Sequence, residues 1–300
     1  MRRTLVLAAL AAALASGPAA VQAAPAAAAE PLLVTPAWLA ERLPDPDLVV
    51  LQVAPLRADY ERGHLPGARF VWLTWLAESS PAGSLEMPPV KELERRLEEL
   101  GVSDGSRVVI CHTLGDPTAA ARVYVTLDYL GMGERAHILD GGFEAWQREG
   151  RPVSRDEPRF KKGKFTPRVR PEVLATVEQI QSGSAAGARL VDARTAQAFN
   201  APEAVSAVRG GHLPGAVNVP VASMTDSLGV YQPPDSLRAR FEKAGIRPGE
   251  PVIAYCGIGR TATPVYVAAK ALGHPVRLYD GSFEEWSRRA ELPVERAEKK

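Results

Sequence analysis

The chain has 300 residues, of which 46% are hydrophobic and 24% are charged, and its net charge is +1. This length suits one large domain or two domains of ordinary size. The near-neutral charge gives no reason to expect a nucleic acid or another polyanion as a partner. The two cysteines, Cys111 and Cys256, exclude a disulfide framework and allow at most one bridge.

The N-terminus has the pattern of a secretory signal peptide. Arg2 and Arg3 provide positive charge, residues 5–15 form an apolar run, and small residues surround Ala23. The apolar run is short for a membrane span, and an uncleaved anchor is the alternative interpretation. We expect residues 1–23 to be removed and the remaining protein to be exported to the periplasm, with no membrane span.

The rest of the chain contains one pattern twice. Both copies carry Gly-His-Leu-Pro-Gly-Ala, then an apolar run, then Asp-Gly-Gly/Ser-Phe-Glu-x-Trp. These landmarks lie at residues 63–68, 107–112 and 140–146 in the first copy and at 211–216, 251–256 and 280–286 in the second. The order is the same, and the spacing drifts by only a few residues. A repeat of this length is typical of a duplicated domain and not of a solenoid.

Each copy alternates short apolar strands with amphipathic helices. The first copy predicts strands at 48–53, 107–111 and 136–139 and helices at 91–100 and 118–129. The second predicts strands at 189–191, 216–219, 251–255 and 276–279 and helices at 236–244, 261–272 and 283–290. This alternation indicates an α/β fold in which helices cover both faces of a parallel sheet.

The domain boundaries follow from composition. Residues 151–170 are rich in Pro, Lys and Arg, which favours a solvated linker over a basic docking patch. We therefore predict a first domain at 31–152, a linker at 153–172 and a second domain at 173–298. Residues 80–89 and 200–211 have the composition of loops within the domains.

The segment around Cys256 carries the chemistry. A buried strand leads directly into this cysteine, and a glycine-containing loop and a helix follow. Such a loop turns backbone N–H groups inward, and the positive end of the helix dipole favours a thiolate. We interpret Cys256 as a nucleophile. Because an exported protein can form disulfides, a bridge between Cys111 and Cys256 is the structural alternative.

These motifs together resemble the tandem-domain rhodanese family, which comprises thiosulfate and 3-mercaptopyruvate sulfurtransferases. The resemblance covers roughly residues 31–298 and implies two tandem rhodanese-like domains with no cofactor. The family's catalytic cysteine opens a six-residue loop, and the matching residues here are Cys256, Gly257, Ile258, Gly259, Arg260 and Thr261. The resemblance implies that the Cys256 thiolate takes the outer sulfur of a small anionic donor as a persulfide. A thiol or cyanide then accepts that sulfur.

Several positions depart from the family pattern. Donor choice in the family follows the second and third loop positions, and Gly257 with Ile258 fits neither the thiosulfate nor the mercaptopyruvate pattern. The substrate-binding arginine that the family pattern places near the Asp-x-Arg segment falls on Ala198. Arg209 or Arg260 could replace it. Arg260 could instead form a structural ion pair or point into solvent.

Two residues of the Asp-x-Arg segment are expected to support the site. Asp192 ends a buried strand, and we expect it to accept hydrogen bonds from the cysteine loop. Arg194 is expected to pair with a carboxylate. His64 and His212 occur in both copies, including the copy without the cysteine, which favours a structural role.

The first copy has His112 where the second has Cys256. Cys111 falls on the strand, where a cysteine behaves as a small apolar residue, and residues 113–117 contain no nucleophile. We therefore predict that the first domain is catalytically silent and supplies one wall of the cleft.

Other classes of function are weaker fits. A phosphatase with this loop would need an arginine six or seven residues after the cysteine, where Ala262 and Thr263 stand. The five histidines show no metal-ligand spacing, so no metal site is expected. A non-enzymatic carrier of sulfane sulfur remains an alternative. A two-domain chain that buries its own cleft can be monomeric.

Overall fold

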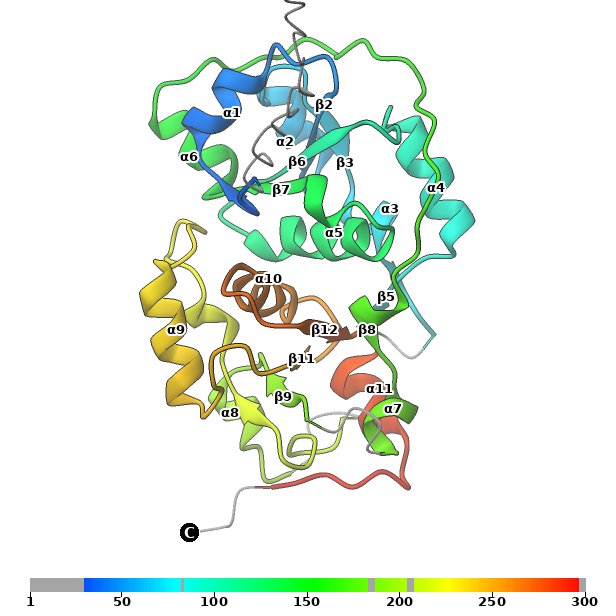
Figure 1. Cartoon of the computed structure of the whole chain (residues 1–300), viewed down its shortest axis with the longest axis vertical. Coiled ribbons are helices and arrows are strands. Elements are labelled where there is room, and N and C mark those ends of the chain that lie inside the picture. Colours follow the sequence, from blue (N-terminus) through cyan, green and yellow to red (C-terminus); the bar gives the residue numbers. More distant parts are fainter. Residues whose placement is uncertain (1–29, 82–83, 183–186, 204–207, 297–300) are drawn as a thin grey trace, which may run out of the picture.

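The computed structural model describes residues 30–81, 84–182, 187–203 and 208–296. The predicted signal peptide, residues 1–23, lies outside the described residues. Within those residues, no helix is both long and apolar enough to cross a membrane. Two α/β domains are stacked along the long axis of the molecule (Figure 1).

The first domain contains a five-stranded parallel sheet with the order β1-β7-β6-β2-β3. Its strands are β1 (Leu33–Val34), β2 (Leu48–Val53), β3 (Arg69–Val71), β6 (Arg107–His112) and β7 (Ala136–Leu139). Its helices are α1 (Pro36–Arg42), α2 (Arg57–Arg62), α3 (Leu73–Leu76), α4 (Val90–Glu99), α5 (Pro117–Tyr129), η1 (Gly133–Arg135) and α6 (Gly142–Arg148).

The second domain repeats this sheet strand for strand, in the order β8-β12-β11-β9-β10. Its strands are β8 (Leu174–Ala175), β9 (Arg189–Asp192), β10 (Val217–Asn218), β11 (Val252–Tyr255) and β12 (Val276–Tyr279). Its helices are η2 (Pro171–Val173), α7 (Val177–Gln181), α8 (Ala196–Phe199), η3 (Val221–Ser223), α9 (Pro234–Lys243), α10 (Thr263–Ala271) and α11 (Ser282–Arg288). The predicted fold class is thus confirmed.

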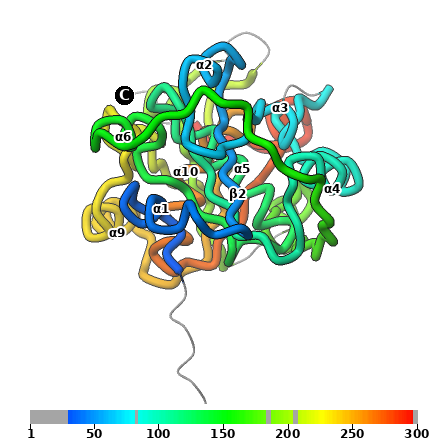
Figure 2. Tube along the Cα trace, turned by 90° about the horizontal axis from the view of Figure 1, so that it is seen from above, coloured from blue at the N-terminus to red at the C-terminus, as the bar shows by residue number. Residues whose placement is uncertain are grey.

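The two domains meet through helices α5 and α10. Figures 1 and 2 place these helices side by side at the centre of the molecule. Both are buried almost all round, because one face covers the helix's own sheet and the other packs against the opposite domain. A single hydrophobic cluster runs through this contact and includes Val123, Leu127, Val265 and Ala268. The domains therefore share this core, and each also has a smaller cluster of its own.

Each domain also extends an arm over the other. In the first domain, β4 (Glu78–Ser79) and β5 (Leu85–Glu86) pair antiparallel, and Met87 N donates to Asp280 Oδ2 at 2.9 Å. In the second, Thr225 bridges Tyr231, whose N–H donates to Asp140 Oδ1 at 2.8 Å. The prediction of a plain loop at 80–89 is therefore wrong over β5, a strand too short for a periodic signal.

The segment between the domains is not a freely solvated linker. Figure 1 shows it running over the outside of the first domain past α4. Phe165 is buried, Gly163 N donates to Glu98 O at 2.8 Å, and Arg168 N donates to Leu130 O at 3.0 Å. Residues 155–170 form no helix or strand, but their backbone is fixed to the first domain, and the last residues of the predicted linker belong to η2.

The duplicated histidines have structural roles. His64 Nδ1 lies 3.0 Å from Tyr60 O, and the two rings stack. His212 Nδ1 lies 2.9 Å from Phe199 O, and these rings stack as well. Each imidazole thus fastens the turn of its Gly-His-Leu-Pro-Gly motif to the preceding helix.

Candidate active site

Cys256 follows the central strand of the second sheet and is fully buried. Its N–H donates to Ser282 Oγ at 3.2 Å. Its carbonyl accepts from Phe283 N at 2.9 Å, and the carbonyl of Gly257 accepts from Glu284 N at 2.9 Å. The first N–H groups of α11, which have no partner inside the helix, therefore fix the backbone at the cysteine.

The loop after Cys256 forms a cradle of backbone donors. Within the described chain, the N–H groups of residues 257–262 have no hydrogen-bond acceptor. Gly259 has φ +82°, and a Cβ there would lie 2.4 Å from Asp280 O. Thr261 is half-buried and closes the loop before α10, which begins at Thr263 and not at 261 as predicted. Free N–H groups beside a helix N-terminus favour an anion.

Neither cysteine forms a disulfide within the described residues. Cys111 lies on β6 in the apolar core of the first domain, and Cys256 belongs to the shared core between the domains. Burial raises the pKa of the Cys111 thiol well above its ordinary value, so this cysteine stays protonated. The alternative of a Cys111–Cys256 bridge does not hold.

Arg260 leaves the loop toward the first domain. Its Nε donates to Thr118 Oγ1 at 2.9 Å, and its Nη2 forms an ion pair with Asp116. The side chains of Arg260 and Asp116 are 38% and 39% exposed, so the pair lies at the edge of the interface. Of the roles considered for Arg260, the structural ion pair is the one observed.

Asp192 and Arg194 bind each other. Arg194 Nε lies 3.0 Å from both carboxylate oxygens of Asp192, and its Nη2 lies 2.6 Å from Oδ2. The expectation that Asp192 accepts hydrogen bonds from the cysteine loop is wrong, because the guanidinium two residues on occupies its carboxylate. Arg194 also lies 4.0 Å over the ring of Phe283, whose N–H binds Cys256 O. Their support of the loop is therefore indirect.

Arg209 does not replace the arginine missing at Ala198. Its guanidinium donates to the carbonyls at the end of α11, namely those of Trp286, Ser287, Arg289 and Leu292, at 2.8–3.1 Å. A cation at a helix C-terminus satisfies carbonyls that lack partners inside the helix. Arg209 is therefore a helix cap. Ala198 is half-buried in α8.

Sequence reasoning missed Arg122, which reaches the loop from the first domain. This residue is fully buried in α5, its Nη1 donates to Gly259 O at 3.2 Å, and it forms an ion pair with Asp280. One signal was available: Arg122 is a lone cation between apolar residues of a helix that is otherwise buried. The contact spans 137 residues of sequence, so local pattern could not identify its target.

The equivalent loop of the first domain is closed. His112 is fully buried, and both of its ring nitrogens lack a partner among the described residues. Burial lowers the pKa of His112 to about 4, so the ring is neutral. Leu114, with φ +59°, donates its N–H to Glu144 Oε1 at 2.6 Å. The arm of the second domain covers the ring, since a Cβ on Gly229 would lie 2.8 Å from His112 Nε2.

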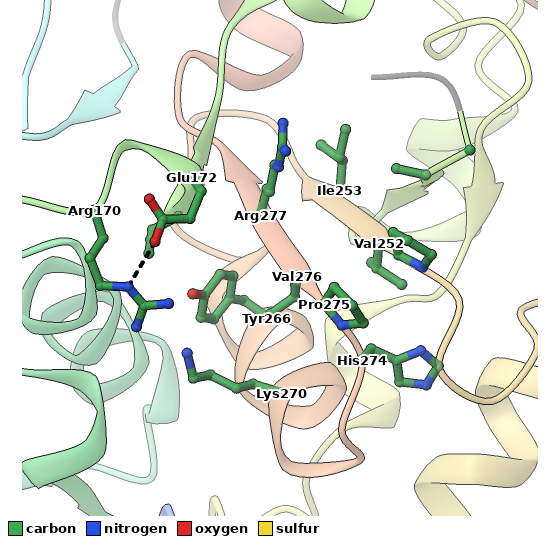
Figure 3. Close-up of a pocket in the computed structure, with 14 residues that line it drawn as sticks. Arg170, Glu172, Val252, Ile253, Tyr266, Lys270, His274, Pro275, Val276 and Arg277 are labelled. Atoms are coloured by element: carbon green, nitrogen blue, oxygen red, sulfur yellow. Dashed lines mark hydrogen bonds and ion pairs between the residues drawn. The ribbon is translucent and has the colours of Figure 1, made fainter. Parts of the chain in front are cut away.

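A pocket of about 470 Å³ lies at the other end of the second sheet (Figure 3). Its basic lining residues come from the linker, α10 and the β12 region: Arg170, Lys270, His274 and Arg277. Arg170 and Lys270 both form ion pairs with the buried Asp128. The pocket borders the amino ends of β11 and β12, whereas ligands of such sheets bind beyond the carboxyl ends, where Cys256 lies.

Comparison with known proteins identifies the family. The model of the rhodanese-like domain matches residues 35–149 and 176–289. The chain belongs to the rhodanese-like family, with one such domain in each half.

Relatives resemble the chain along nearly their whole length. A thiosulfate sulfurtransferase of Azotobacter vinelandii is 33% identical over 267 residues, which cover 88% of this chain and 97% of that protein. A 3-mercaptopyruvate sulfurtransferase of Escherichia coli K12 is 32% identical over 271 residues, 86% and 95% of the two chains. The crystal structure of SseA from Escherichia coli, described as a 3-mercaptopyruvate sulfotransferase, superimposes with a TM-score of 0.73 at 30% identity. It covers 84% of this chain and 99% of its own.

Proposed function

We propose that the protein is a sulfurtransferase that moves the outer sulfur of thiosulfate to a thiophilic acceptor through a persulfide on Cys256. The observation that carries the proposal is the cradle of free N–H groups at residues 257–262, beside a cysteine at the carboxyl end of the central strand. The names of the relatives support the same reaction class.

The reaction balances without a cofactor. The Cys256 thiolate attacks the outer sulfur of thiosulfate, an Sγ–S bond forms, and the S–S bond of the donor breaks, so that sulfite leaves with the electron pair. Cyanide or a thiol then attacks the outer sulfur of the persulfide, and the thiolate is regenerated. Sulfur stays anionic in both halves, and fixed backbone donors stabilise such charge without reorganising.

The loop geometry supports access of a small donor. An added Cβ on Gly257 would meet no atom within 4 Å, so the space beside the cysteine is open at that position. Ile258 is 42% exposed and forms an apolar lip next to it. The charge of a donor would therefore meet backbone N–H groups, and Arg260 could contribute only after leaving Asp116.

3-Mercaptopyruvate is the second candidate donor, because one of the relatives and the SseA structure carry that name. Gly257 matches the loop pattern of such enzymes. However, release of pyruvate requires a proton at the carbon that loses sulfur, and Ile258 has no hydroxyl that could move one. Thiosulfate cleavage requires no proton transfer of this kind, so we propose thiosulfate as the preferred donor.

A thiocyanate assay with cyanide as acceptor tests the function. We expect turnover with thiosulfate that exceeds turnover with 3-mercaptopyruvate, and none with Cys256→Ser. Intact mass of the protein after donor treatment should show one added sulfur on Cys256. A stoichiometric persulfide without turnover would identify a sulfur carrier instead. Thiocyanate formation by wild type at the same rate as by Cys256→Ser would refute the enzymatic function.

We further propose that the protein acts in the periplasm after removal of residues 1–23. The charged, apolar and small-residue regions of the N-terminus support this location. The mass of the protein from a periplasmic extract should correspond to a chain that starts at Ala24. Recovery of the full-length chain from the cytoplasm would contradict it.

A further inference from the structure

The catalytic loop is held from outside its own domain. Ile258 O accepts from Leu85 N of the first domain at 2.7 Å. Gly259 O accepts from Arg122 Nη1 at 3.2 Å, and the side chain of Arg260 binds Thr118. Three consecutive loop residues thus take a partner from the domain that lacks a nucleophile.

These contacts determine where the loop's N–H groups point. In a planar trans peptide, the C=O of one residue and the N–H of the next point in opposite directions. Because the carbonyls of Ile258 and Gly259 face the first domain, the N–H groups of Gly259 and Arg260 face away from it. Both N–H groups belong to those that have no acceptor within the described chain. The first domain therefore keeps them available to an anion.

Arg122 is the side chain through which this control acts. It is fully buried, and its charge is balanced by Asp280, whose side chain is 13% exposed. Its Nε and Nη2 have no partner among the described residues, so the guanidinium is far from saturated. Burying a cation whose donors are only partly hydrogen-bonded lowers stability, so the fold pays a free-energy cost to keep Arg122 at this position. Its neighbours Ala121 and Val123 show that α5 packs in this core with apolar side chains.

The same ion pair fixes the far side of the loop. Asp280 accepts Met87 N at 2.9 Å in addition to Arg122, so its carboxylate is held twice by the first domain. The main-chain oxygen of Asp280 is close enough to Gly259 that an added Cβ would lie 2.4 Å from it. Gly259 is thus held between Arg122 and a residue that Arg122 itself fixes.

We propose that Arg122, although it lies in the silent domain, is a positioning residue for sulfur transfer at Cys256. It holds the Gly259–Arg260 peptide so that the N–H of Arg260 faces the anionic sulfur. This proposal rests on the proposed sulfurtransferase function, because sulfur transfer is the reaction for which Arg122 would position the loop. If so, the first domain helps to orient the catalytic loop and does not only supply one wall of the cleft.

The test uses Arg122→Met in the full chain, with Cys111→Ser in every protein so that Cys256 is the sole thiol. We expect kcat for thiocyanate formation to fall about 10- to 100-fold with a smaller change in KM. The reason is that the N–H of Arg260 would no longer be held toward the charge on the reacting sulfur in the transition state. The pH at which alkylation of Cys256 by iodoacetamide reaches half its maximal rate should rise. A merely structural role would lower stability without moving this pH profile.

Tyr266→Phe is the matched control. Tyr266 is the counterpart of Arg122 under the alignment that pairs His112 with Cys256, and its hydroxyl donates to Asp128 across the same interface at 2.6 Å. It is fully buried, and among the described residues its hydroxyl binds Asp128 and none of residues 256–262. Loss of the Tyr266 hydroxyl should weaken the contact between the domains, while kcat and the pH profile of Cys256 alkylation stay those of wild type.

Arg122→Lys keeps the proposal testable if the methionine variant does not fold. Lysine retains the charge but not the forked donors, so we expect an intermediate kcat and an intermediate shift of the alkylation profile. Wild-type kcat and profile in either folded Arg122 variant, or equal effects in Tyr266→Phe, would overturn the positioning role. Alkylation of Cys256 needs no sulfur donor, so this measurement decides the role of Arg122 independently of turnover. If the wild-type protein transfers sulfur from neither thiosulfate nor 3-mercaptopyruvate, that result refutes the proposed function but not the positioning role.

Discussion

The loops after Cys256 and after His112 occupy the same place in two copies of one fold, yet their N–H groups have different fates. After Cys256, the donors of residues 257–262 are free within the described chain. After His112, the N–H of Leu114 is bound by Glu144, and Asp116 caps the next helix. The difference shows that a position at the carboxyl end of a central strand is not sufficient to make a loop an anion site. A site also needs donors that no internal carboxylate has taken.

Exchanging the nucleophile between the two loops is the largest test of this comparison. Cys256→Ser should lower sulfur transfer by on the order of 10³-fold or more, because the attacking atom is lost. Adding His112→Cys to that variant should restore nothing, since the N–H groups of Leu114 and Asp116 are bound inside the first domain and the arm of the second domain covers position 112. Thiocyanate formation by the double variant above that of Cys256→Ser would break the comparison.

Gly259→Ala should have the next largest effect. The added Cβ would meet Asp280 O at 2.4 Å in a backbone with φ +82°, so the loop must shift. We expect kcat to fall about 10- to 100-fold and the free energy of unfolding to fall by about 1–3 kcal/mol. Steady-state kinetics and urea unfolding measure the two effects.

Gly257→Ala is the stability control for that variant. Its Cβ would meet no atom within 4 Å, and its φ lies outside the left-handed region. The free energy of unfolding should stay within about 0.5 kcal/mol of wild type. An equal loss of stability in the two alanine variants would show that the close approach at Gly259 is not what constrains the loop.

The buried His112 in the loop of the first domain predicts a pH dependence of stability. Its pKa is about 4 in the fold against 6.5 for an ordinary histidine. Between these values the unfolded chain binds more protons, so the contribution is full above about pH 6.5 and is lost as the pH falls toward 4. The loss should amount to about 3 kcal/mol at most.

Urea unfolding at several pH values checks this dependence. His112→Asn should be less stable than wild type at pH 7 and should lose less stability on acidification, because it has no imidazole to protonate. Parallel curves for the two proteins between pH 7 and 4 would contradict the assignment to His112.

Cys111→Ser should have the smallest effect. The thiol contacts His112 O at 3.3 Å inside the first domain and takes no part in the Cys256 loop. We expect kcat within about twofold of wild type and a stability loss of about 1 kcal/mol, since a hydroxyl replaces a small apolar group. A large loss of activity with intact stability would give the first domain a chemical role.

The sequence by itself determined the duplicated α/β architecture, the central strands and the position of Cys256 and its loop. Apolar runs, glycines and repeated motifs are local signals, and the buried parallel strands left no other arrangement. The sequence also indicated that Arg194 would pair with a carboxylate, as it does with Asp192.

Tertiary structure decided which polar groups meet. Arg122 reaches Gly259, Arg209 caps α11, Arg260 turns to Asp116, and Asp192 is occupied by Arg194. A guanidinium can bind any carboxylate or carbonyl within its reach, so its partner depends on which elements pack beside it. For the loop after Cys256, that packing comes from the opposite domain, and the free N–H groups are therefore a property of both domains together.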